Sequence, residues 1–422
     1  MKKFFITFIL FLVSVLPSFG EVVHITMDKA VELALENNLD LKSKRKQAEE
    51  MEQNIKIANA LKNPQFQSNF LMGKVTRGNS SQFGLAVPIE VSKRGIRKKI
   101  AQKDLDIIQK EIKAKELDLK IEVMRNYFYI LYAKSVVKIL QDREKLFKEM
   151  QSIAEQHPKN SSNYKLDVLH SQMKYQKQVV FLNRAKANLL SAQFELNNSL
   201  NIKDSEILYD TVEPSLFANN LSILDLNLMP YQEIEATAMK YSYSLSIAQD
   251  NIQRSEQEVT NEKHKRIPDI TVGGGYAYQT AHQTGSGALP GAYVGVNADI
   301  PLFYFYTPEV NRAKIVLERS KIDKDSFENH LKYALKEDYN KFKYAKINVT
   351  YYQDILKESN TILEEHKKRY QKGQSSLLNL LQVENMHQET LRDYIDVVQR
   401  YYDAYLDMMH NVGHDILLQT DL

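Results

Sequence analysis

Proline and glycine are distributed very unevenly along this 422-residue chain, and their distribution limits the folds that the chain can adopt. Residues 89–157 and 309–422 contain no proline. Glycine is absent from 96–272 and, apart from Gly373, from 296–412. Because proline and glycine are the residues that interrupt helices most strongly, these stretches can form very long helices.

The last part of the chain has the hydrophobic pattern of a coiled coil. Apolar residues recur there in alternating steps of three and four, and Glu384 and His387 are the only polar members of the stripe. A repeat sustained over this length is typical of helices that pack as long hairpins. With a turn around Gly373, the pattern predicts two antiparallel helices at 308–371 and 376–412.

The first half of the chain repeats this construction, which indicates an internal duplication. Tyr132-Ala133-Lys134 matches Tyr344-Ala345-Lys346 in the second half. A heptad repeat again follows a polar turn, at about 157–163. We predict a first repeat at 21–201 and a second at 231–414, with a linker at 202–230, which has no long periodicity, and a tail at 415–422.

Segments with a period of two lie before each long helix. Alternating apolar residues predict strands at about 64–74 and 82–91 in the first repeat and at about 268–279 and 292–303 in the second. A strand of roughly ten residues is long enough to cross a membrane. Four strands cannot close a barrel, so we expect several copies to assemble. Two copies would supply eight strands and three would supply twelve.

Helix lengths suggest a tall wall. At a rise of ~1.5 Å per residue, the long helix of each repeat measures roughly 90 Å. The two shorter helices of each repeat, placed end to end, have about the same length. The predicted fold class is therefore mainly α with a β-barrel part: long antiparallel helical hairpins form an α-barrel, and the strands contribute to a transmembrane β-barrel.

The first residues have the pattern of a secretory signal. Two lysines precede an apolar run, and small residues occupy the positions that a signal peptidase reads, which predicts a cleavable signal peptide at 1–20. The chain has no cysteine, so we expect no disulfide, no thiolate metal site and no lipid anchor on cysteine. Its 56 basic and 53 acidic residues nearly balance, which argues against a nucleic-acid partner.

Short segments mark the borders between the predicted strands and helices. They are Asn63-Pro64, Pro88 to Arg97, Ile267-Pro268-Asp269, Ile300 to Phe303, and the turn from Tyr370 to Gln382. These segments resemble the corresponding borders of the TolC-like outer-membrane efflux protein family, and the resemblance covers essentially the whole chain after the signal. The segment Pro88 to Arg97 is similar to the heavy-metal (cobalt-zinc-cadmium type) subgroup, although Val91-Ser92 stands where that subgroup often has glycines.

The resemblance implies a homotrimer with a twelve-stranded barrel in the outer membrane and an α-barrel in the periplasm. It also implies partners: outer-membrane lipid, a periplasmic adaptor (membrane fusion) protein and an inner-membrane pump of the resistance-nodulation-division type. The protein would be a passive duct for metal cations or small toxic compounds, without a cofactor or catalysis. A different class stays open, namely a periplasmic coiled-coil adaptor or scaffold that bridges the membranes without a pore.

Three groups of residues are candidates for functional sites. The aperture candidates are Asp167, Asn379, Glu384 and His387; the adaptor-docking tips are Pro158, Lys159, Asn160, Ser161, Ser162, Gly373, Gln374 and Ser375; the membrane-belt aromatics are Phe303, Tyr304, Phe305 and Tyr306. A ring of carboxylates at an aperture would attract cations.

Each of these candidates also has a structural explanation. Asp167 could instead favour the start of a helix. Glu384 and His387 could share a metal or a proton, or they could relax the packing of the last helix near an aperture. The aromatics could be a plug of core residues instead of a belt.

Overall fold

The computed structural model describes residues 22–71, 80–156, 164–204, 206–217, 229–279 and 289–413. The predicted signal peptide and the predicted C-terminal tail lie outside these residues. The chain forms two compact units: unit 1 comprises 1–42, 114–242 and 331–422, and unit 2 comprises 43–113 and 243–330.

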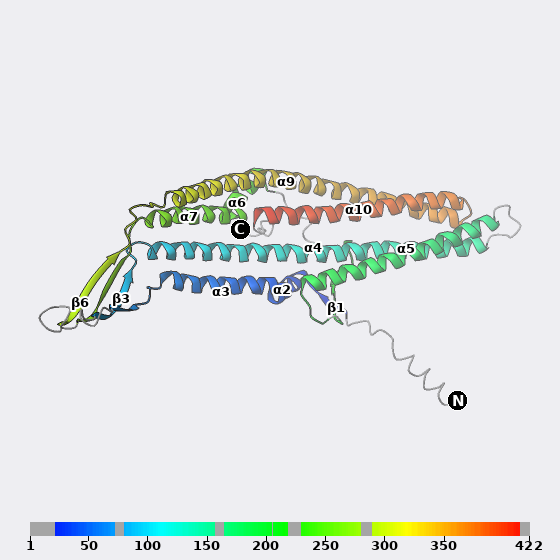
Figure 1. Cartoon of the computed structure of the whole chain (residues 1–422). Coiled ribbons are helices and arrows are strands. Elements are labelled where there is room, and N and C mark those ends of the chain that lie inside the picture. Colours follow the sequence, from blue (N-terminus) through cyan, green and yellow to red (C-terminus); the bar gives the residue numbers. More distant parts are fainter. Residues whose placement is uncertain are drawn as a thin grey trace, which may run out of the picture. The chain divides into compact units, whose positions relative to one another are not determined.

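The described elements are mostly helices in consecutive pairs, separated by strands (Figure 1). In chain order they are β1 (Val22–Ile25), α2 (Met27–Asn37), α3 (Leu39–Asn59), β2 (Gln65–Leu71), β3 (Ser80–Ile89), α4 (Arg94–Gln156), α5 (Tyr164–Ser199), β4 (Leu208–Thr211), α6 (Tyr231–Tyr241), α7 (Tyr243–His264), β5 (Ile270–Gln279), β6 (Leu289–Ala298), α9 (Thr307–Gln371) and α10 (Leu377–Val412). None of the described helices combines the length and the hydropathy that a membrane-spanning helix needs.

The two long helices predicted in the second repeat are confirmed close to their expected bounds, and the first repeat contains a similar pair. α4 has 63 residues and α9 has 65, and both run without a break from unit 2 into unit 1. Their partners α5 and α10 have 36 residues each. The scarcity of proline and glycine explains these lengths: within the described residues of these four helices, the only such residues are Gly95 and Pro308, and both lie in the first turn of their helix, where they are tolerated.

The core of unit 1 buries the stripe predicted on α10. The aromatic rings of Phe128 on α4 and Tyr402 on α10 stack with centroids 4.0 Å apart, and those of Phe342 on α9 and Tyr401 stack at 4.7 Å. Tyr401, Tyr402 and Phe342 are completely buried. Aromatic stacking and burial hold these three long helices together, and they contribute more to the stability of the helices than helix propensity does.

In each repeat, two short helices precede the strands: α2 and α3 in the first repeat, and α6 and α7 in the second. The sequence did not reveal the first helix of each pair. α2 ends at Asn38, with ψ 120°, and α6 ends at Ser242, with ψ 118°. Both helices have 11 residues, and in each the capping N–H donates to the carbonyl four residues earlier. The side chain of Asn38 also accepts from the N–H of Leu41, at 2.8 Å, and so starts α3. This shared geometry is an independent sign of the duplication.

The segment 202–230, expected to be irregular, contains a strand. β4 pairs in parallel with β1, with His24 opposite Asp210. The side chain of Asn197 at the end of α5 accepts from the N–H of Tyr209, at 3.0 Å, and donates to the carbonyl of Ile207, at 2.6 Å. A two-stranded sheet of four residues per strand gives too weak a periodic signal to predict.

Unit 2 contains a four-stranded antiparallel sheet in the order β2-β3-β5-β6. The two hairpins, β2–β3 and β5–β6, come from different repeats and join where β3 pairs with β5. The last strand ends at Ala298, five residues earlier than expected. The predicted strand end at 303 is therefore wrong: Phe303–Tyr306 lie in the connection that leads to α9, where Pro301 interrupts strand pairing.

Glycines let the central strands approach closely. A Cβ atom at Gly275 would lie 1.9 Å from the carbonyl oxygen of Phe83 and 2.5 Å from the Cα of Gly84. A Cβ at Gly84 would meet the hydroxyl of Tyr293 at 2.3 Å. The glycine run at 273–275 therefore serves the packing of strands.

This close approach yields a test of the sheet. We expect Gly275→Ala to reduce stability by about 1–3 kcal/mol, because the added methyl group overpacks against backbone that cannot move aside cheaply. Gly295→Ala on β6 is the matched control, since a Cβ there meets nothing within 4 Å. Thermal unfolding of the purified protein measures both; equal midpoints for the two variants would contradict the close packing.

Candidate functional site

The two faces of the sheet in unit 2 differ sharply in polarity. The register places large apolar side chains on one face, and all of them are exposed in the single chain. They are Phe66, Phe70, Phe83, Leu85, Val87, Ile89, Ile270, Val272, Tyr276, Tyr278, Val294 and Val296. The opposite face carries small and polar residues, among them Gln67, Gln82, Thr271 and Asn297. This alternation is the pattern of strands with lipid on one side and water on the other.

The sheet is open at both edges. β2 and β6 are the outer strands, and within the described residues each pairs with one neighbour only. The backbone N–H and C=O groups on their outer sides therefore have no strand partner in a single chain. In a membrane, such groups would each cost several kcal/mol.

The predicted membrane-belt aromatics lie just beyond this sheet. Phe303 is fully exposed, and Tyr304 and Phe305 are about half exposed. The hydroxyl of Tyr304 donates to Glu309 at 2.7 Å, at the start of α9. The exposure of Phe303–Phe305 disagrees with a plug of core residues within this chain.

In unit 1, the polar residue Glu384 is buried and forms an ion pair that links two helices. It lies on α10 and is completely inaccessible to solvent. The Nε atom of Arg143 on α4 lies 2.8 Å from one carboxylate oxygen, and an Nη atom lies 3.0 Å from the other. Burial raises the pKa of Glu384, and Arg143 opposes this shift. The paired guanidinium is what allows a carboxylate at a core position.

His387, one turn further along α10, has a different partner. Its Nδ1 lies 2.9 Å from the hydroxyl of Ser359 on α9, and its side chain is buried. Burial lowers the pKa of His387, and the nearby charge of Lys367 lowers it further, so the imidazole is neutral at pH 7. Glu384 and His387 thus contact different helices. Among the described residues, no group of three or more His, Asp and Glu side chains is arranged to hold a metal ion.

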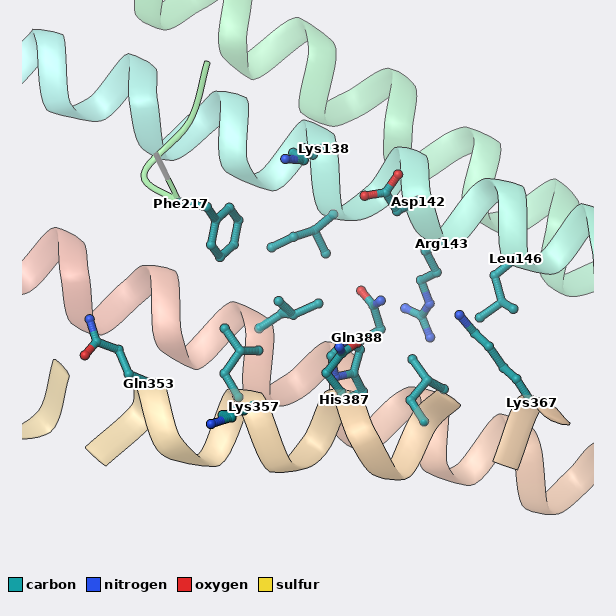
Figure 2. Close-up of a pocket in the computed structure, with 15 residues that line it drawn as sticks. Lys138, Asp142, Arg143, Leu146, Phe217, Gln353, Lys357, Lys367, His387 and Gln388 are labelled. Atoms are coloured by element: carbon teal, nitrogen blue, oxygen red, sulfur yellow. The ribbon is translucent and has the colours of Figure 1, made fainter. Parts of the chain in front are cut away.

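A cavity of about 520 Å³ opens beside His387 and Arg143 (Figure 2). Its walls come from α4, α9 and α10, and Phe217, after β4, forms one end. Arg143 and Lys367 extend into it from opposite helices. The sequence could not reveal this cavity, because it depends on the spacing of three helices that are far apart in the chain.

The remaining predicted residues lie near the turns between the helix pairs. Gly373 has φ +70°, and the N–H of Gln374 donates to the carbonyl of Arg369 at 2.8 Å, which is a glycine-dependent end of α9. Asn379 is exposed in the first turn of α10, where its N–H donates to the side chain of Ser376. Asp167 lies in the first turns of α5, but its side chain is outside the described part of the chain. The same applies to all of Pro158–Ser162.

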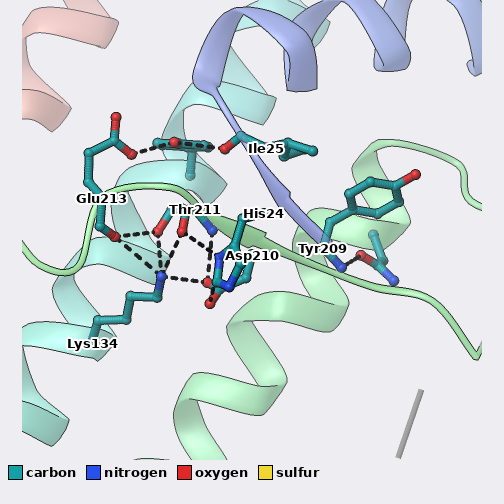
Figure 3. A network of polar contacts seen from close by, with 9 residues as sticks. His24, Ile25, Lys134, Tyr209, Asp210, Thr211 and Glu213 are labelled. Atoms are coloured by element: carbon teal, nitrogen blue, oxygen red, sulfur yellow. Dashed lines mark hydrogen bonds and ion pairs between the residues drawn. The ribbon is translucent and has the colours of Figure 1, made fainter. Parts of the chain in front are cut away.

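A polar network around β4, which sequence reasoning missed, ties α4 to the small sheet (Figure 3). The ammonium group of Lys134 lies 2.9 Å from the carboxylate of Asp210 and donates to the hydroxyl of Thr211 at 2.8 Å. Tyr127 donates to the carboxylate of Glu213. Lys134 and Asp210 are nearly buried, so this network fixes where the linker crosses unit 1.

Comparison with known proteins identifies relatives of this arrangement. The family model described as outer membrane efflux protein matches residues 30–201 and 237–414. The cobalt-zinc-cadmium resistance protein CzcC of Cupriavidus metallidurans is 23% identical over 282 residues, which cover 66% of this chain and 63% of CzcC. The chain therefore spans less than two thirds of that relative's length.

Solved structures share the fold over nearly the whole chain. One is CusC, whose crystal structures were studied for folding and transmembrane channel formation. It has a TM-score of 0.74 at 14% identity, and the match covers 94% of each chain. The open-state MtrE outer membrane channel of Neisseria gonorrhoeae has a TM-score of 0.72 at 14% identity, with 92% of this chain and 89% of MtrE covered. The predicted fold class is thereby confirmed, with its helical barrel and its β part.

The buried state of His387 gives a prediction on pH. Its pKa is lower in the folded protein than the ordinary value of 6.5, so the unfolded chain takes up a proton first as pH falls. The stability contributed by the neutral imidazole is complete above about pH 6.5 and is lost as pH falls below it.

His387→Gln should remove this dependence and keep a hydrogen-bonding group near Ser359. The thermal unfolding midpoint of the wild type, minus that of the variant, should decrease as the pH is lowered from 7 to 5. A constant difference across this range would contradict the buried neutral imidazole. Exposed His170→Gln is the control.

Proposed function

Because the chain belongs to the outer membrane efflux protein family, we propose that it is the outer-membrane exit duct of a tripartite efflux or export system. The observation that carries this proposal is the four-stranded sheet with one exposed apolar face and two open edges. A passive duct needs a wall that faces lipid outside and water inside, and the sheet has both faces.

The open edges of β2 and β6 support a homotrimer. If β6 of one chain pairs with β2 of the next, three chains give a closed twelve-stranded barrel, and every edge in the membrane finds a partner. Two chains would give an eight-stranded barrel, and side chains would nearly fill the interior of such a barrel. The trimer therefore fits conduction, and the long helices would continue the duct into the periplasm as an α-barrel.

The helix turns are the proposed contact with the other two components. The turn at Gly373, Gln374 and Ser375 exposes polar groups, and its duplicate at Pro158–Ser162 would complete the tips. We assign these tips to a periplasmic adaptor, which links the duct to an inner-membrane pump of the resistance-nodulation-division type. The pump would supply the energy.

The transported substrates are proposed to be metal cations or small toxic compounds. The name of the relative CzcC, a cobalt-zinc-cadmium resistance protein, supports the first class. Asp167, repeated in three chains, would form a carboxylate ring at the aperture that attracts cations. Asn379 would be its neutral counterpart in the second repeat, and the interhelical pairs of Glu384 and His387 would be contacts that yield when the aperture opens.

Single-channel conductance in a planar bilayer tests the duct. We expect discrete, cation-preferring openings from a protein that crosslinks as a trimer, and Asp167→Ala should reduce the preference for cations. Asn379→Ala is the matched control and should leave selectivity unchanged. Absence of conductance from folded protein would instead support a scaffold that bridges the membranes without a pore.

The membrane-facing assignment has its own test. Val294 on the apolar face is 83% exposed, and a lysine there would cost about 2–4 kcal/mol near the bilayer centre. We expect Val294→Lys to lower the amount of protein in the outer-membrane fraction severalfold. Asn297→Lys on the opposite face of the same strand should insert normally. Equal insertion of both variants would show that the apolar face does not meet lipid.

A further inference from the structure

The cavity beside Arg143 in unit 1 has the size and composition of a small-molecule site. Its volume of about 520 Å³ lies within the roughly 300–1,000 Å³ that is usual for such sites. α4, α9 and α10 of one chain, together with Phe217, supply its walls. A ligand could therefore be held by a single chain, whatever the number of copies in the assembly.

One part of this cavity is apolar. Ile139 and Leu363 are buried in its wall, and Leu356 and Leu391 are half-buried beside them. Phe217 is held in place by stacking on Tyr394, with ring centroids 5.7 Å apart. An aromatic or alicyclic body of a ligand would be desolvated against these side chains.

The polar part of the cavity carries an excess of positive charge. Four lining side chains are cationic, against one carboxylate, Asp142, which pairs with Lys145 outside the cavity. The cationic side chains are Lys138, Arg143, Lys357 and Lys367.

The charges nearest the cavity centre are only partly compensated. Buried Glu384 pairs with Arg143, while the second cation that extends into the cavity, Lys367, pairs with Glu364 on its own helix, at 2.8 Å. The side chain of Lys367 is 30% exposed, so the Glu364 pair contributes little. An anion between Arg143 and Lys367 would receive charge-assisted hydrogen bonds from both.

From this arrangement we propose that the cavity binds an amphipathic organic anion: one sulfonate, carboxylate or phosphate group between Arg143 and Lys367, and a ring-containing body against Phe217. The amide group of Gln388 also lines the cavity, beside Arg143, and would complete the coordination of the anion. Metal cations do not fit, because the lining repels them. The site is separate from the proposed ring of Asp167, although His387 lines it and Glu384 pairs with Arg143, and ligand binding there does not require conduction.

The chain itself allows a clean binding assay, because it contains no tryptophan. Phe217→Trp would place a single fluorophore at the end of the cavity, and exposed Gln353→Trp is a second reporter in case the first variant fails to fold. The probe is 8-anilinonaphthalene-1-sulfonate, which absorbs where tryptophan emits. N-phenyl-1-naphthylamine, which has the same aromatic body without the sulfonate, is the neutral control. Protein in zwitterionic lipid nanodiscs is titrated with each probe.

We expect the sulfonate to quench the tryptophan saturably, and Lys138→Gln combined with Lys367→Gln to weaken its binding about tenfold. Lys148→Gln, an exposed lysine of α4 that does not line the cavity, should change the affinity less than about twofold. The neutral probe should respond equally little to all of these lysine variants.

Three outcomes would overturn the proposal. They are quenching that does not saturate, the same loss of affinity in the Lys148 control, and the same loss for the neutral probe. The first would mean that the probe only partitions into lipid. The second would mean that long-range charge, and not the cavity, attracts the anion.

Discussion

Unpaired backbone groups at the edges of β2 and β6 are the constraint on which the rest of this protein depends. A four-stranded sheet with an apolar face is stable in neither water nor lipid on its own, because water opposes the face and lipid opposes the edges. In the proposed assembly, pairing with further copies of the chain satisfies the edges, and lipid can then cover the apolar face.

Within unit 1, the two ends of α10 are held by different interactions, apolar packing at one end and specific polar contacts at the other. The aromatic residues at the C-terminal end of α10 pack without polar interruption, whereas Glu384 and His387 each require a specific partner on another helix. Removing a partner from a buried charge is costly, but exchanging one set of polar contacts for another is much less so. If the proposed aperture opens by rearrangement of α10, the polar contacts of Glu384 and His387 would be exchanged at a lower cost than the apolar packing.

The sequence predicted those features that depend on local pattern. Missing prolines and glycines gave the long helices, and alternation gave all four strands of the large sheet, although the last strand ended early at Ala298. The short helices α2 and α6, which precede Asn38 and Ser242, escaped prediction because 11 residues give only a weak periodic signal. The partners of Glu384 and His387 escaped as well, since periodicity says which face of a helix is buried but not which residue meets it: Arg143 lies 241 positions away.

The pairing of β3 with β5 has a consequence for the order of folding. Each hairpin can form from neighbouring residues, but Ile89 pairs with Ile270, so the centre of the sheet closes a loop of roughly 180 residues. Contacts of such long range form slowly. Until they form, the newly made chain carries two separate hairpins, each with an apolar surface and free edges. Its greatest exposure to aggregation therefore comes before the two repeats have found each other.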